Sequence, residues 1–175
     1  DKDLPIIKHA MQNFTGQCKY IIVPHEVNPK YIKKIKSLLD DIKIKHICLS
    51  QTINDSIGNY GCVIIDSVGI LLDVYKYAEV AYVGAGFSHG VHSVIEPLAQ
   101  NCVVCYGPNI DILDEAVEIT QLKIGQLIHN SEDLINIFKL INDEDKLKEI
   151  QNKGLRYINN KLNATEKIIA HLNNL

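Results

Sequence analysis

The sequence has 175 residues and no apolar run that approaches the roughly 20 residues of a membrane-spanning helix. It begins Asp1-Lys2-Asp3-Leu4-Pro5, without an initiator methionine and without the layout of a signal peptide. We therefore expect a soluble chain that is part of a longer protein, in which any membrane anchor would lie upstream.

Zinc-finger spacing is also missing. The five cysteines are Cys18, Cys48, Cys62, Cys102 and Cys105. None of them is matched with histidines at zinc-finger spacing, and four of the five lie inside apolar, strand-like runs. His89 and His92 lie in a glycine-rich loop with no Asp or Cys constellation nearby. We expect buried free thiols, a reducing compartment and no metal site.

Two further functional classes lack support. No Gly-x-Ser-x-Gly elbow is present, which leaves serine hydrolase chemistry without its nucleophile motif. The net charge is −3 with 22% charged residues, so the chain carries no basic footprint for nucleic acid. We expect no nucleic-acid partner.

What the sequence does contain is a series of short apolar runs rich in β-branched residues. Continuous runs of this kind are typical of strands that are covered on both faces, and hence of a parallel sheet. The runs are Tyr20-Ile21-Ile22-Val23, His46-Ile47-Cys48-Leu49, Cys62-Val63-Ile64-Ile65, Val80-Ala81-Tyr82-Val83 and Val103-Val104-Cys105-Tyr106.

Helical patterns alternate with these runs. Asn28 and Pro29 have the character of an N-cap and a first helical residue, and further helices are predicted over 67–77, 91–100 and 111–121. Such alternation predicts right-handed βαβ units: an α/β, Rossmann-like parallel sheet with helices on both faces. Residues 1–175 are expected to form a single domain.

The two ends of the chain have a different pattern. A helix is predicted from about Leu4 to Phe14, and residues 1–17 are interpreted as an interdomain connection. From Ser131 onward the pattern is helical only, with one segment opening at Ser131-Glu132-Asp133 and one or two more from Asp143 to Asn174. Residues 131–175 are predicted to be helices that close the sheet.

Ligands of an open parallel sheet bind beyond the carboxyl ends of its strands. Pro24-His25-Glu26 follows the first strand, where a helix N-terminus could hold an anion, or where the side chains simply cap the helix. Asp66 or Ser67, after the third strand, is predicted to cap a helix, while Gly69 would let a ligand approach the backbone. Gly107-Pro108-Asn109, after the fifth, is an ordinary turn that would line the far wall.

The stretch after the fourth strand is the richest in such residues. Gly84, Gly86 and Gly90 would let the backbone bend around a ligand, although their spacing does not match Gly-x-Gly-x-x-Gly. Gly90 to Glu96 is expected to open a helix whose N–H groups suit a phosphate, with Glu96 a turn further in as an acceptor for ribose hydroxyls. That combination is what a sugar nucleotide requires. The alternative is a flexible loop with a helix cap and a surface glutamate.

The order and spacing of these segments resemble the donor half of a GT-B glycosyltransferase, and most closely the 3-deoxy-D-manno-octulosonic acid (Kdo) transferases. The resemblance extends from Lys19 to about Ala116. It is carried by Pro24-His25-Glu26, Asp66-Ser67-Val68-Gly69-Ile70-Leu71, Ala78-Glu79-Val80-Ala81-Tyr82-Val83-Gly84, His92-Ser93-Val94-Ile95-Glu96-Pro97 and Tyr106-Gly107-Pro108.

The resemblance implies a donor site around the cytidine monophosphate part of CMP-Kdo. Its residues would be Pro24, His25, Ser67, Val68, Gly69, Ile70, Gly84, Gly86, His92, Ser93, Val94, Ile95 and Glu96. The chain departs from the usual family pattern at three of them: Ser93 stands in place of Asn, His25 in place of a frequent Arg, and Ile70 in place of a frequent acidic residue.

The function implied is transfer of Kdo from CMP-Kdo to a lipid A precursor at the cytoplasmic face of the bacterial inner membrane. In this family the general base belongs to an N-terminal acceptor-binding domain, so we assign no catalytic residue here and expect no cofactor. The chain alone should not catalyse Kdo transfer.

Two alternatives remain at this stage. One is the corresponding domain of another GT-B glycosyltransferase with a UDP-sugar donor, since the glycine loop and Glu96 are shared across that fold. The other is a non-catalytic domain that keeps the nucleotide-binding fold without the ligand, which the departures at Ser93 and Ile70 leave open.

Overall fold

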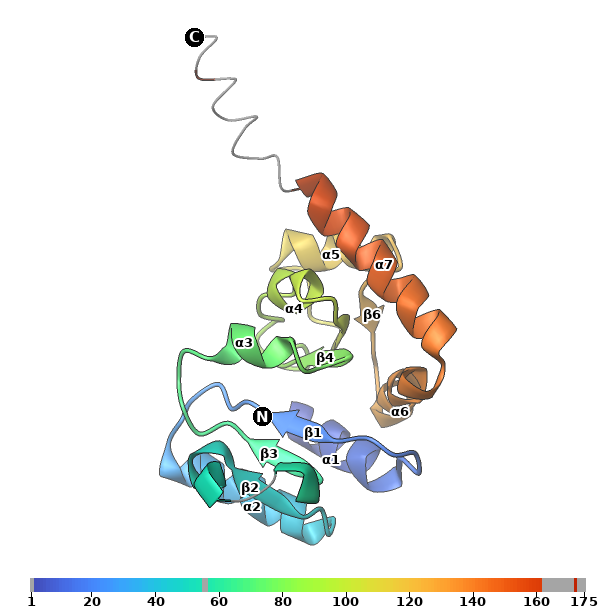
Figure 1. Ribbon diagram of the computed structural model, residues 1–175. Coiled ribbons are helices and arrows are strands. Elements are labelled where there is room, and N and C mark those ends of the chain that lie inside the picture. Colours follow the sequence, from blue (N-terminus) through green and yellow to red (C-terminus); the bar gives the residue numbers. More distant parts are fainter. Residues whose placement is uncertain (1, 55–56, 162–171, 173–175) are drawn as a thin grey trace.

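Six short strands alternate with helices along the chain, as the apolar runs predict (Figure 1). The computed structural model describes residues 2–54, 57–161 and 172. The strands are β1 (Tyr20–Ile22), β2 (His46–Cys48), β3 (Cys62–Ile64), β4 (Val80–Val83), β5 (Val103–Tyr106) and β6 (Gln126–Leu127). Every pairing between them is parallel, which confirms the predicted fold class.

The strands form two three-stranded sheets, ordered β1-β3-β2 and β4-β5-β6, rather than one uninterrupted doubly wound sheet. β3 lies between its neighbours, with Cys62 in register with Tyr20 on one side and His46 on the other. Within the described residues β1 and β4 each pair on one side only. The hydrophobic core is continuous between the two sheets, because Ile7 and Phe138 pack against clusters from both of them.

Helix α2 (Pro29–Asp41) connects β1 to β2 and begins as predicted. Pro29 occupies the first turn, and the Asn28 side chain accepts a hydrogen bond of 2.9 Å from the backbone N–H of Tyr31. This N-cap satisfies one of the N–H groups that a helix leaves unpaired at its start. Ile35 and Leu39 are the buried residues of the apolar stripe.

The helices after β3 and β4 are shorter than predicted and begin later. They are α3 (Leu71–Tyr75) and α4 (Ile95–Ala99), while α5 (Asp114–Gln121) follows β5. The predicted helix cap at Asp66 or Ser67 is wrong, because α3 starts after Ile70 and has no side-chain cap. Short 3₁₀ helices complete the connections at Leu49–Asn54, Ile57–Asn59 and Leu140–Asn142.

Helix α1 (Asp3–Asn13) packs against α6 (Ser131–Lys139). The buried carboxylate of Asp3 accepts a hydrogen bond from the Tyr82 hydroxyl on β4. The N-terminal helix is thus attached to the β4-β5-β6 half. A role for residues 1–17 as an interdomain connection stays a prediction.

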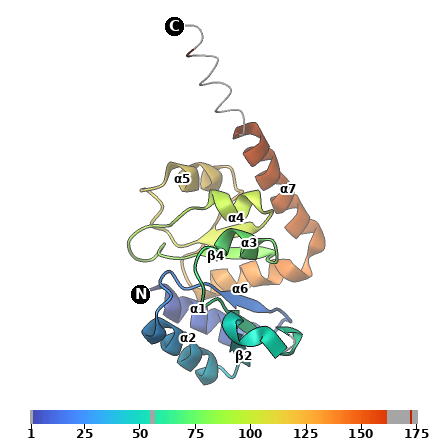
Figure 2. The ribbon, with the colours of Figure 1, turned by 60° about the vertical axis from the view of Figure 1, so that its left-hand side comes forward.

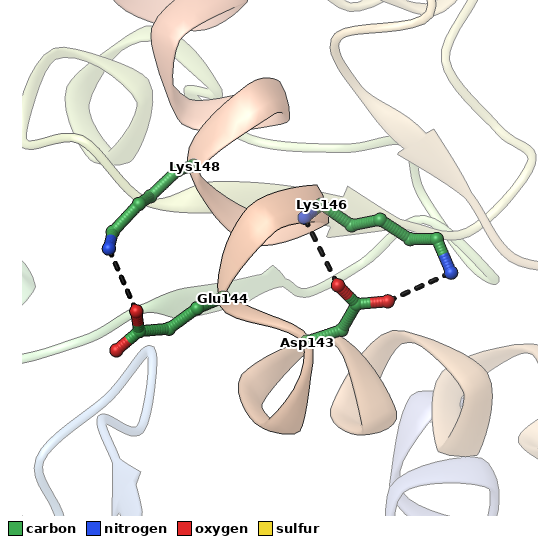
Figure 3. Close-up of polar contacts among 4 residues, drawn as sticks. All are labelled: Asp143, Glu144, Lys146 and Lys148. Atoms are coloured by element: carbon green, nitrogen blue, oxygen red, sulfur yellow. Dashed lines mark hydrogen bonds and ion pairs between the residues drawn. The ribbon is translucent and has the colours of Figure 1, made fainter.

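The last described helix, α7 (Glu144–Lys161), runs along the β4-β5-β6 half in both views (Figures 1 and 2). Asp143 precedes it and accepts a hydrogen bond from the Lys146 backbone N–H at 3.2 Å, as Figure 3 shows. The same carboxylate pairs with the Lys146 ammonium, and Glu144 pairs with Lys148. Helical structure after Ser131 is confirmed to Lys161; most of the predicted remainder to Asn174 lies outside the described residues.

The core of the β4-β5-β6 half holds the loop after β4 in place. Val91, Val94 and Leu98 are buried against Tyr106 of β5. At about 25 cal/mol per Å² of buried apolar surface, each such side chain contributes roughly 1.5–3 kcal/mol to folding. No helix in the described part of the chain is both long and apolar enough to cross a bilayer.

Candidate functional site

The predicted site residues follow β1, β3 and β4, at the carboxyl ends of parallel strands. Pro24 comes two residues after β1, Asp66 two residues after β3, and Gly84 directly after β4. Because the pairing is parallel, the strands of each sheet end on the same edge. The loops that follow are therefore placed to form one surface.

Two histidines connect the loop after β1 with the loop after β4. The imidazole rings of His25 and His92 stack with their centroids 5.1 Å apart and their planes inclined by 4°. Both side chains are exposed. Imidazole N–H groups can donate hydrogen bonds, and the rings carry positive charge when protonated, so the pair offers an anion two donors on adjacent loops.

The turn after β3 is held from the end of β2. The Ser50 backbone N–H donates to Asp66 Oδ1 at 3.0 Å, and the Ser50 hydroxyl donates to Oδ2. Partial burial by itself would raise the pKa of Asp66, but these hydrogen bonds hold the pKa below its usual value. Asp66 is therefore an ionised group that fixes the turn after β3.

Beyond Asp66 the chain presents its backbone to solvent. Gly69 has φ +85°, a conformation that side chains disfavour, and no atom lies within 4 Å of where its Cβ would be. Ser67 and Val68 are exposed, Val68 at 80%, while Ile70 is only partly buried. The main chain of this segment is open to solvent, and its predicted contact with a ligand stays a prediction.

Glu96 lies in the first turn of α4 rather than a turn further in, because the helix begins only at Ile95. Its side chain is exposed, and its negative charge affects the pKa of Tyr75 on α3. Burial, and then the negative charge of Glu96, raise the pKa of Tyr75 to about 12. Glu96 is thus an exposed carboxylate near the start of α4.

The glycines of the loop after β4 serve different purposes. Gly84 has open space where a Cβ would project, which fits close approach by a ligand. A Cβ on Gly86 would meet Gly107 N at 2.5 Å, and one on Gly90 would collide with the Ile112 side chain. Gly86 and Gly90 thus permit close packing against the segment between β5 and α5, and their role in bending around a ligand stays a prediction.

Residues 92–95 divide into exposed and buried positions. His92 and Ser93 are exposed, Ile95 is partly buried, and Val94 has no exposed surface. The Val94 side chain lies in the core and cannot contact a ligand, so only its backbone is available for the predicted role. Pro97 has no N–H, so Ile95 and Glu96 supply the amide donors of the first turn of α4.

The sequence analysis missed one residue that supports the site, Ser50, and named another, Asn109, only as part of a turn that would line the far wall. Ser50 lies in the 3₁₀ helix Leu49–Asn54 after β2, a segment with no glycine or recognisable motif to mark it. Asn109 donates from its backbone to Gly86 O at 2.8 Å and from its side chain to Ser88 O at 3.0 Å. Its place in the unremarkable Gly107-Pro108-Asn109 turn was the only available signal.

The described residues contain no group of three or more His, Cys, Asp or Glu side chains that could hold a metal ion. A shallow cavity of about 390 Å³ lies at the start of α2 and reaches Asp66. A second, of about 570 Å³, lies between α1 and α2 and is lined by none of the predicted donor-site residues. The larger cavity is thus separate from the predicted site.

Comparison with known proteins places this surface in context. No protein-family model matches the chain. The 3-deoxy-D-manno-octulosonic acid transferase of Chlamydia muridarum is 29% identical over 138 residues, 75% of this chain and 32% of that protein. The transferase of the same name from Rickettsia prowazekii is 27% identical over 164 residues, 90% of this chain and 34% of that protein. The chain therefore spans about a third of the length of these relatives, and the predicted resemblance is confirmed.

A relative of a different kind and a solved structure complete the comparison. A bifunctional glycosyltransferase/methyltransferase of Fusobacterium nucleatum is 28% identical over 127 residues, 71% of this chain and 20% of that protein. The crystal structure of the C-terminal CMP-Kdo binding domain of WaaA from Acinetobacter baumannii aligns with a TM-score of 0.68 and 14% sequence identity. The alignment covers 89% of this chain and 98% of that domain, so the two share a fold.

Proposed function

We propose that this chain is the donor-binding domain of a Kdo transferase, which transfers Kdo from CMP-Kdo to a lipid A precursor in lipopolysaccharide biosynthesis. The observation that carries the proposal is the fold alignment over 98% of a CMP-Kdo binding domain. Sequence similarity to curated Kdo transferases supports it independently. The alignment extends over 89% of this chain rather than one isolated motif.

In this proposal the nucleotide part of the donor lies on the surface formed by the loops after β1, β3 and β4. Pro24 and His25 flank it on one side, Val68-Gly69-Ile70 on another, and Ser93 to Glu96 on the third. The exposed Gly69 backbone and the open space beside Gly84 permit close approach. The exposed carboxylate of Glu96 is suited to accept hydrogen bonds from the ribose hydroxyls.

The chemical contribution of the domain would be to the leaving group. During direct displacement the acceptor oxygen forms a bond to the anomeric carbon of Kdo, while the bond from that carbon to the phosphate oxygen breaks and its electrons leave with CMP. The imidazoles of His25 and His92 and the N–H groups of Ile95 and Glu96 would stabilise the charge on the departing phosphate.

The proton of the acceptor hydroxyl must go to a base on the acceptor side. We assign that base to an acceptor-binding domain outside this chain, so no residue here is proposed as catalytic and no metal or organic cofactor is required. The whole enzyme would act at the cytoplasmic face of the bacterial inner membrane, where its lipid acceptor is presented. The chain alone should bind donor without turnover.

Calorimetric titration of the chain with CMP, UDP and NAD in parallel tests the proposal. Saturable binding of CMP is expected, weakened about tenfold or more by Glu96→Ala because charge-assisted hydrogen bonds to ribose are lost. Glu115→Ala, which removes an exposed glutamate from the first turn of α5, serves as the matched control and should bind CMP normally.

The other ligands distinguish the alternatives. A preference for UDP over CMP would indicate a different GT-B glycosyltransferase. Absence of binding to all three nucleotides would favour a domain that has kept the fold without the ligand. Robust Kdo transfer by the chain alone would contradict the assignment of the base to another domain.

A further inference from the structure

The cavity between α1 and α2 has four lysines among its nine lining residues. The two helices run side by side (Figure 2), and the cavity walls include a single aspartate. The lining residues are Leu4, Pro5, Lys8, Lys30, Lys33, Lys34, Ser37, Leu38 and Asp41. Such an excess of lysine is notable in a chain whose net charge is −3.

The one acidic group does not neutralise this surface. Asp41 pairs with Lys8 at 2.9 Å. Within the described part of the chain, no carboxylate forms an ion pair with Lys30 or Lys33, and both side chains are exposed. The positive charge of these two lysines is therefore directed to solvent.

The basic surface continues along α2. Lys33 also lines the smaller cavity, together with Lys36 and Asn28. From Lys30 to Lys36 the helix advances by about 9 Å at 1.5 Å per residue. The cations are thus spread along one side of α2 and onto α1, instead of converging on one point as they would around a single phosphate.

Apolar groups lie among the cations. Leu4, Pro5 and Leu38 form part of the larger cavity, and Val27 and Ile32 part of the smaller one. Lysine side chains can lay their aliphatic stems on apolar surface while the ammonium groups reach a phosphate layer. A nucleic-acid-binding domain typically has a basic overall charge, whereas the net charge of this chain is −3.

We propose that the α1–α2 face, defined by Lys8, Lys30, Lys33, Lys34 and Lys36 with the apolar groups between them, docks on the surface of an anionic lipid bilayer. An array of phosphates in a membrane matches cations spread over two helices. Each lysine near such a surface strengthens binding severalfold, and the attraction falls as salt screens it. This inference does not depend on nucleotide binding, although Lys36 lines the smaller cavity, which reaches Asp66 beside the predicted donor site.

Vesicle sedimentation tests the proposal, with phosphatidylcholine vesicles compared to vesicles that also contain phosphatidylglycerol. The chain should bind only the anionic vesicles, and binding should weaken at high salt. Lys30→Gln/Lys33→Gln should lower the partition coefficient roughly 25-fold, because each lysine contributes a factor of about five. Lys148→Gln/Lys153→Gln makes the same change in net charge on α7 and should lower it about twofold or less.

Circular dichroism of both double variants checks that they fold. Equal loss in the two variants, or equal binding to neutral and anionic vesicles, would overturn the proposal. Binding to DNA or RNA that depends on Lys30 and Lys33, without binding to vesicles, would overturn it as well. A parallel CMP titration reports separately on the donor site, so failure of one proposal is distinguishable from failure of the other.

Discussion

His25 and His92 lie 67 positions apart in the sequence, yet their imidazole rings stack face to face with centroids 5.1 Å apart. One ring belongs to the loop after β1 and the other to the loop between β4 and α4. These two strands lie in different sheets and share no ladder within the described residues. The stacked pair is therefore a direct contact between the halves of the predicted donor surface.

This contact predicts that the two histidines act as a unit in nucleotide binding. His25→Ala and His92→Ala should each weaken CMP binding, and the double variant should lose less than the sum of the single losses. The expected coupling is about 0.5 kcal/mol or more, typical of side chains in contact. Calorimetric titration of the four proteins measures it; strictly additive losses would mean that the stacking has no part in binding.

The contact between Gly86 and Gly107 predicts a stability effect. In Gly86→Ala the new methyl group would meet Gly107 N at 2.5 Å, and backbone cannot move aside as a flexible side chain can. The free energy of unfolding should fall by about 1–3 kcal/mol, the usual cost of overpacking.

Urea denaturation measures this loss. Gly84→Ala is the matched control, because its Cβ would have no neighbour within 4 Å and its φ is not positive. The control should change stability by about 0.5 kcal/mol or less. An equal loss in the two variants would contradict the close approach of the loops after β4 and β5.

The hydrogen bonds from Ser50 to Asp66 predict a dependence of stability on pH. They hold the pKa of Asp66 below the value of about 3.9 expected in the unfolded chain. The stabilisation is therefore fully present above that pH and is lost as the pH falls through the lower, folded-state pKa.

In Ser50→Ala the hydroxyl donor is gone, so the loss of stability on acidification below about pH 4 should be smaller than in the natural chain. Thermal unfolding across the acid range measures the difference. Ser67→Ala, which alters the exposed serine next to Asp66, should retain the natural pH profile. Identical profiles for all three proteins would show that Ser50 does not influence the Asp66 carboxylate.

Local sequence patterns were sufficient for much of the fold. Val80–Val83 and Val103–Tyr106 form strands at the predicted bounds, and Asn28 caps α2 with Pro29 in its first turn. These features depend on neighbours along the chain, such as a continuous β-branched run or a side chain that bonds an N–H three residues on. The sequence alone is enough to identify them.

The features that were missed depend on contacts between distant segments. Strand order depends on which surfaces pack together, so β3 could not be placed between β1 and β2 from the apolar runs. The cap predicted at Asp66 failed because α3 begins only at Leu71, and the carboxylate bonds Ser50, 16 residues earlier, instead. Gly86 could not be separated from Gly84 without knowing that Gly107 lies against it.

The most direct test of the donor-site proposal is to map the CMP contact surface by nuclear magnetic resonance, using the amide spectrum of the nitrogen-15-labelled chain. We predict saturable shift changes centred on the amides of His25, Gly69, Ser93 and Glu96, with the α1–α2 face unchanged. The absence of saturable changes, or changes confined to the α1–α2 face, would contradict the assignment of the donor site to the loops after β1, β3 and β4.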